Sequence, residues 1–208
     1  MNRLLRPYLT QKVRAFSLIE VGMALLIIGV LIGAVLKGKD ILDSAKLFSI
    51  TKDFQNIKHS VASYQDTYHY LPGDDPEANR FGTTITPGNG DQKISAEESG
   101  QVWIHLKAAG LWKNQEAPTS KLGGIYSLST NIEGESWISL ALNANGDALL
   151  TPKQAVELKA KLQSMDSDLS DEDIIIDNGQ GALNNCVANG RINHDIKQKV
   201  CIIRCKLS

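Results

Sequence analysis

The chain has 208 residues, with 22 lysines and arginines against 23 aspartates and glutamates, so its formal net charge is −1. This balance argues against nucleic acid as the main partner, because proteins that bind phosphates carry a strongly basic face. About 170 residues remain beyond the apolar segment described next, which is enough for one domain with a single core.

One apolar run dominates the N-terminal part of the chain. Residues 16–36 read FSLIEVGMALLIIGVLIGAVL and carry a single charge, Glu20. About 20 apolar residues at 1.5 Å each match a hydrocarbon core of roughly 30 Å. A secretory signal core is shorter, ~7–15 residues, and is followed by a small-residue cleavage site, whereas here the polar residues KGKD follow. We therefore expect residues 16–36 to stay in the mature protein as a transmembrane helix.

The first 15 residues form a short basic leader. It contains four cations and no acid: Arg3, Arg6, Lys12 and Arg14. By the positive-inside rule, the leader is expected in the cytoplasm and the chain after Lys37 on the other side of the membrane. The sequence thus predicts a single-pass protein with an exported head.

Residues 15–20 read AFSLIE. This stretch closely resembles the processing site of type IV prepilins and type II secretion pseudopilins of the bacterial inner membrane. The resemblance implies that prepilin peptidase cuts between Ala15 and Phe16, that the new amine of Phe16 is methylated, and that Glu20 is the family's acid at the fifth mature position. The family usually has glycine where this chain has Ala15, which is the next smallest residue.

Glu20 needs a physical explanation inside such a segment. An ionised carboxylate in a spanning helix costs ~2.5 kcal/mol or more unless it is paired. The resemblance implies a partner, because the Phe16 ammonium of a neighbouring subunit can compensate the Glu20 carboxylate when both lose water. The other interpretation places Glu20 near the lipid headgroups, where its side chain reaches water.

A helical pattern continues beyond the apolar run. Apolar residues recur at steps of three and four, which indicates one buried face of a helix: Leu47, Ile50, Phe54, Ile57, Val61, Tyr64 and Tyr68. Leu71-Pro72-Gly73 then ends the pattern. We predict one helix from residue 16 to about residue 70, with 37–71 as an amphipathic continuation. We expect its stripe to pack against the chain's own head, 72–208, although a coiled coil is possible in principle.

The head contains an internal near-repeat. Two Asn-Gly-Asp turns, at 89–91 and 145–147, are each followed by a capping box, Ser95-x-x-Glu98 and Thr151-x-x-Gln154. These signals predict helices over 96–109 and 152–165, the second with proline at its first position.

The same turns loosely imitate a calcium loop. In the first copy Asn89, Asp91 and Glu98 would take the third, fifth and twelfth positions, with the Lys93 carbonyl at the seventh. The first and sixth positions lack the expected acid and glycine, and the second copy ends in glutamine. A turn with a capping box explains both copies more simply, so calcium is the alternative interpretation and no other cofactor is expected.

The rest of the head reads as a sheet. Residues 124–129 and 136–142 alternate apolar and polar side chains around a turn, which is typical of a hairpin, and 200–207 predicts a last strand. The predicted class is α+β: a long N-terminal membrane-spanning helix packed into a small C-terminal head with an antiparallel sheet. The stretches LPGDDPEA, GNGD to HLKAAGLW and LTPKQA also resemble, more loosely, the heads of some minor pilins and pseudopilins.

Three cysteines, Cys186, Cys201 and Cys205, lie in the last quarter of the chain. On the exported side a disulfide is the expected state, and no C-x2-C pair suggests zinc. The pairing of Cys186 with Cys201 is favoured because the heads of the resembled family often end in a strand that begins with such a cysteine. Pairing of Cys186 with Cys205 is the alternative.

Catalytic signatures are missing from the sequence. The four histidines, His59, His69, His105 and His194, are dispersed, and there is no HExxH, G-x-S-x-G or P-loop motif. The favoured hypothesis is therefore a structural subunit that enters a filament, and no enzymatic activity is expected. Its partners would be prepilin peptidase, other pilin or pseudopilin subunits, the inner-membrane assembly platform and membrane lipid.

The rival hypothesis comes from a different class. It is a single-span, membrane-tethered periplasmic binding module or enzyme whose leader is never cut. Under the favoured hypothesis the chain is a minor subunit of a type IV pilus or a type II secretion pseudopilus. It would first reside in the bacterial inner membrane with its head in the periplasm, and then in the filament.

Processing gives the first testable prediction. The resemblance to prepilins implies that the peptidase requires a small residue before the cut. Ala15→Gly should therefore be processed at least as fast as the natural protein, and Ala15→Leu should not be cut. The measurement is the mobility shift of the newly made protein in membranes that contain the peptidase. Equal processing of the leucine variant would remove the prepilin assignment.

Overall fold

A computed structural model describes residues 16–131, 133–180, 182, 185–188 and 190–207. The leader, including Ala15, lies outside the described residues. The chain divides into two compact units, residues 1–43 and 44–208, and each is described by itself. Helix α1 (Leu18–Tyr68) contributes to both units, which confirms the predicted single helix and its end before Pro72.

The described part of the first unit is helical and apolar. An 18-residue window of α1 has a mean hydropathy of 2.6, and none of it is buried within the structure. Among the described residues, α1 is the one helix long and apolar enough to cross a membrane. The transmembrane role of 16–36 stays a prediction.

The second half of α1 supplies one side of the core of the second unit. Six side chains of the predicted stripe are each at most 2% exposed: Leu47, Ile50, Phe54, Ile57, Val61 and Tyr64. The Phe54 ring meets the Tyr126 ring edge to face, with centroids 5.4 Å apart. The stripe therefore packs against the chain's own head, as expected.

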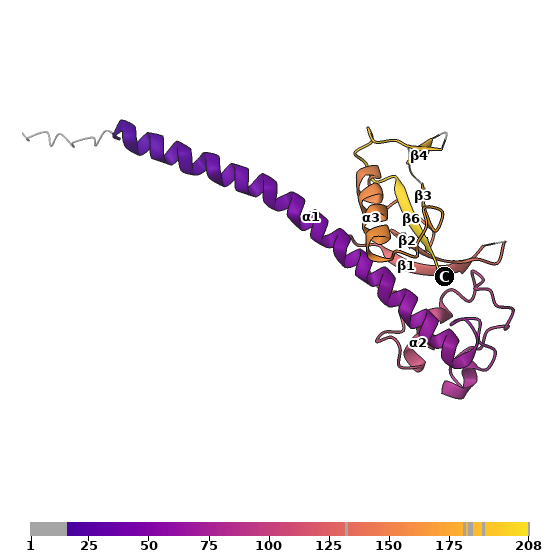
Figure 1. The fold of residues 1–208 in the computed structure, drawn as a ribbon. Coiled ribbons are helices and arrows are strands. Elements are labelled where there is room, and N and C mark those ends of the chain that lie inside the picture. Colours follow the sequence, from indigo (N-terminus) through magenta and orange to yellow (C-terminus); the bar gives the residue numbers. More distant parts are fainter. Residues whose placement is uncertain (1–15, 132, 181, 183–184, 189, 208) are drawn as a thin grey trace, which may run out of the picture. The chain divides into compact units, whose positions relative to one another are not determined.

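The partner of this stripe is an antiparallel sheet of four strands in the order β1-β2-β6-β3 (Figure 1). The strands are β1 (Ile125–Thr130), β2 (Ser136–Ala141), β6 (Cys201–Lys206) and β3 (Ile174–Asn178). One row of side chains runs across all four strands and is at most 1% exposed: Leu128, Ile138, Cys205 and Ile174. A small second sheet joins β4 (Val187–Ala188) to β5 (Arg191–Ile192). The α+β class is confirmed.

Helix α3 (Pro152–Met165) forms where the second capping box predicts it. The Thr151 hydroxyl accepts a hydrogen bond from the Gln154 N–H at 3.3 Å, and the Gln154 side chain accepts one from the Thr151 N–H at 3.1 Å. The helix buries Leu158 and Leu162 in the core. An ion pair between Lys58 and Asp166, 3.0 Å long, links α1 to the residue that ends α3.

The first capping box behaves differently. Its hydrogen bonds form, because the Ser95 hydroxyl accepts from the Glu98 N–H at 3.3 Å and the Glu98 carboxylate accepts from the Ser95 N–H at 3.0 Å. Helix α2 (Gln101–Ala108) nevertheless begins five residues later than predicted. The Gln101 N–H bonds to the Glu98 carbonyl, a three-residue step that makes a tight turn instead of an α-helical one. A short 3₁₀ helix, η1 (Ala78–Phe81), lies in the loop before it.

The structure joins Cys186 to Cys201, with the Cα atoms 5.2 Å apart, which is the pairing that the family resemblance implied. Cys205 is a free thiol buried in the sheet. Burial raises the pKa of the Cys205 thiol to about 11, so this thiol stays protonated near neutral pH and is a poor nucleophile.

The disulfide gives a prediction about stability. Closing a loop of ~15 residues stabilises the fold by ~3 kcal/mol in the chain-entropy model, so Cys186→Ser should lower the free energy of unfolding of the head by about that amount. Cys205→Ala is the matched control, because it removes a cysteine and keeps the bridge. Denaturant unfolding of the full chain in detergent measures both. Mass mapping that finds three free thiols in exported protein would contradict the prediction.

Candidate functional site

Phe16 and Glu20 lie at the N-terminal end of the described chain. Phe16 precedes α1 and is 78% exposed, and Glu20 is exposed in the first turn of the helix. Phe16, Glu20 and Ala24 line one shallow hollow at this end. Among the described residues, no side chain or backbone group forms a hydrogen bond or ion pair with the Glu20 carboxylate.

This end of the chain has no apolar cover of its own. The described large apolar side chains from Phe16 to Leu42 each expose at least 48% of their surface. A Cβ atom built on Gly29 or Gly33 would meet nothing within 4 Å. No described residue therefore covers these apolar side chains or lies against these two glycines.

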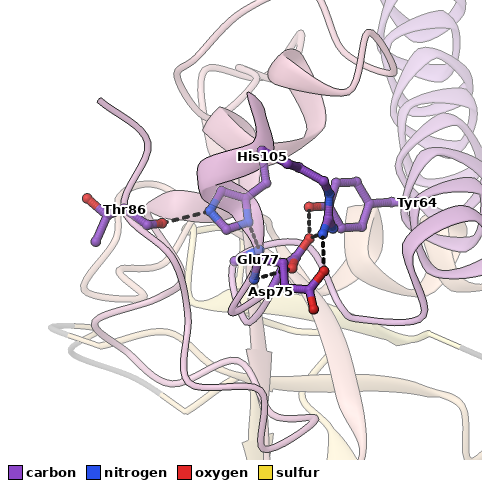
Figure 2. A network of polar contacts seen from close by, with 7 residues as sticks. Tyr64, Asp75, Glu77, Thr86 and His105 are labelled. Atoms are coloured by element: carbon purple, nitrogen blue, oxygen red, sulfur yellow. Dashed lines mark hydrogen bonds and ion pairs between the residues drawn. The ribbon is translucent and has the colours of Figure 1, made fainter. Parts of the chain in front are cut away.

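A second candidate site is the polar network at the far end of α1 (Figure 2). The Asp75 side chain is fully buried. It accepts a 2.5 Å hydrogen bond from the Tyr64 hydroxyl and one of 2.9 Å from the Glu77 N–H, and it pairs with Arg80. Burial, and after it the hydrogen bond to Asp75, raises the pKa of Tyr64 well above its usual range. The hydroxyl therefore remains a donor, and the network holds the loop after α1 to the helix.

Asp74, the neighbouring acid, is also fully buried. One carboxylate oxygen accepts hydrogen bonds from the Gly90 N–H at 2.7 Å and the Asp91 N–H at 3.1 Å, and the other accepts from the Gln92 N–H at 2.7 Å. Successive backbone N–H groups of this kind form a concave anion site. Here the chain fills that site with its own carboxylate.

The four candidate calcium ligands lie in this same region, in and after the turn. The Asn89 and Asp91 side chains accept hydrogen bonds at 2.9 Å from the N–H groups of Asp91 and Lys93. The Glu98 carboxylate accepts from the Asn89 and Ser95 N–H groups. In the described part of the chain, no group of three acidic, histidine or cysteine side chains is arranged to hold a metal ion. The contacts support the turn interpretation, and we propose no calcium site.

Sequence reasoning missed the network around Asp74, Asp75 and His105. The available signal was two adjacent acids flanked by prolines and glycine, in LPGDDPEA, directly after a long helix. Adjacent acids in a loop usually face water, so their burial could be inferred only with the donors that meet them.

No protein-family model matches the chain, and no curated protein matches it. Among solved structures, the chain is similar to the major type IV pilin PilA1 from Clostridium difficile, with 17% sequence identity and a TM-score of 0.42. The alignment covers 80% of this chain and 96% of that one.

The polar network gives a prediction about stability. Tyr64→Phe keeps the buried ring and removes the donor to Asp75, so it should lower the free energy of unfolding of the head by ~1.5–3 kcal/mol, the range for hydrogen bonds to charged groups. Tyr70→Phe is the matched control, since no described residue bonds to its hydroxyl. Urea unfolding of both variants makes the comparison. Equal stabilities would show that the Tyr64 hydroxyl adds nothing.

Proposed function

We propose that this chain is a structural subunit of a bacterial type IV pilus or type II secretion pseudopilus. In this proposal, prepilin peptidase of the inner membrane cuts before Phe16, and residues 16–36 then pass from lipid into the core of a helical filament. The observation that carries the proposal is the exposed apolar stretch 16–35, whose single acid, Glu20, is the fifth residue after the cut.

The exposed apolar surface of the first unit suits two environments in succession, first the lipid bilayer and then the filament. Apolar side chains favour any surrounding other than water by ~25 cal/mol per Å² of buried surface. Lipid tails satisfy this requirement before assembly, and the helices of neighbouring subunits satisfy it afterwards. Gly29 and Gly33 suit the second environment, because small residues let helix backbones approach closely.

The charge of Glu20 supports the same proposal. A carboxylate without a partner in the described chain is costly in lipid and stabilising beside a cation. The new ammonium of Phe16 on a neighbouring subunit is such a cation. Docking would therefore bring the Glu20 carboxylate of one subunit beside the Phe16 ammonium of the next, and this favours one register of one subunit against the next.

The second unit supplies a stable body outside the membrane. Its core is built on the second half of α1, so any displacement of the helix along its axis would move the head with it. We propose that the subunit is a minor component, because a head spanning residues 72–208 is large for the repeating unit of a filament. The inner-membrane assembly platform would act on the membrane-embedded form.

Glu20 gives the test of the proposal. Glu20→Val should leave membrane insertion intact, since it makes the segment more apolar, and should reduce assembly. Leaving one member of a buried pair without its partner costs ~3–5 kcal/mol, which corresponds to several hundredfold or more in the docking equilibrium. Glu20→Asp should be intermediate, because it keeps the charge and shortens its reach.

The measurement is cofractionation with sheared surface filaments, or crosslinking to other pilin-like subunits, with the membrane fraction as control. Glu20→Gln is the matched variant, because it keeps the size of the side chain and removes the charge, and it should behave like Glu20→Val. Normal entry of Glu20→Val into filaments would contradict the role of the acid in assembly and favour the tethered module.

A further inference from the structure

His105 of α2 is fully buried and joins two distant points of the loop that follows α1 (Figure 2). Its Nδ1 atom accepts a hydrogen bond from the Gly73 N–H at 3.0 Å. Its Nε2 atom lies 2.9 Å from the Thr86 carbonyl oxygen. A backbone N–H can only donate and a carbonyl can only accept, so these partners require a neutral ring with its proton on Nε2.

A second proton on this ring has no acceptor. It would bind to Nδ1, where it would face the Gly73 N–H, and two donors would then oppose each other. Gly73 has little room to adjust, because its φ is +97° and an added Cβ would lie 2.9 Å from Val102 and 3.0 Å from the Glu98 carbonyl oxygen. The protonated ring therefore cannot keep the contact that the neutral ring makes.

We propose that His105 is a proton-sensitive latch, which holds the 72–90 loop against α2 while it is neutral and releases the loop when it gains a second proton. Loss of the hydrogen bond between Gly73 and His105 would also disturb the two buried acids that follow Gly73. Asp74 and Asp75 follow Gly73 directly, and their bonds to Gly90 and Tyr64 tie the loop together. This inference does not depend on assembly into a filament.

The groups around His105 determine whether its pKa is raised or lowered in the closed loop, and therefore how loop closure depends on pH. Burial is the largest influence and lowers the pKa of His105. Asp75 in the loop and Glu98 before α2 oppose this change, whereas Arg80 of η1 reinforces it. From α1, the Tyr64 ring stacks on the imidazole at a centroid distance of 6.4 Å. The closed loop thus binds the second proton less readily than the open loop does.

The sign of the pH dependence follows. In the open loop His105 should titrate near its ordinary pKa of about 6.5. Stability of the closed loop is therefore complete above about pH 6.5 and falls as the pH drops below it, until the lowered pKa of the closed state is reached. With one linked proton, the opening constant should rise between pH 7.5 and 5.5, by at most about tenfold.

Hydrogen exchange of the full chain in detergent micelles tests the proposal, after correction for the pH dependence of intrinsic exchange. Between pH 7.5 and 5.5, the corrected exchange rate of peptides from 72–90 should rise with the opening constant, and that of peptides from α3 should not. His105→Gln should give a loop that opens more readily at pH 7.5 and no longer responds to pH. His59→Gln, which removes an exposed histidine of α1, is the matched control and should keep the natural response.

Nitrogen NMR of the natural protein provides a test that needs no variant. The His105 ring should carry its proton on Nε2 at pH 7.5, and its titration should coincide with a change in the Gly73 amide signal. Two results would overturn the latch: titration of His105 with no change in exchange of the 72–90 loop, or an unchanged pH response in His105→Gln.

Discussion

The contact between the second half of α1 and the sheet is the interaction on which the rest of the structure depends. Phe54 and Tyr64 sit in a core that also receives Leu128 from β1 and Leu158 from α3, so no layer of the head would be complete without the helix. In the described part of the chain, nothing covers the first half of α1 in this way. One helix therefore combines two different surfaces, an apolar face buried in the head and an apolar stretch that is exposed.

The loop between α1 and α2 shows how the end of that helix is fixed. Asp74 is held by backbone N–H groups, Asp75 by Tyr64 and Arg80, and His105 by two backbone groups. Buried polar groups stabilise a unique conformation when every donor and acceptor is matched, and they are costly when one partner is lost. The matched contacts that hold this loop are also the ones that, in our proposal, a single added proton on His105 would break.

Much of this fold follows from local patterns in the sequence. The helical stripe, the capping box at Thr151 and the alternating hairpin are local signals, and each predicts its element to within a few residues. β3 was missed because its apolar residues, Ile174 to Ile176, do not alternate and follow an acidic run, and only pairing with β6 makes them a strand. The burial of His105 likewise depends on contacts distant in sequence, with Gly73 and Thr86, which no local pattern reports.

The central claim is that residues 16–36 form the assembly surface of a processed subunit, and the N-terminus of the mature protein tests it most directly. N-terminal sequencing and intact mass of the protein from native membranes should find Phe16 as the first residue, with a methylated amine. A host without prepilin peptidase should yield the chain with its leader. A natural protein that still begins with the leader in peptidase-containing membranes would contradict the account, because Phe16 would then have no free ammonium to meet Glu20.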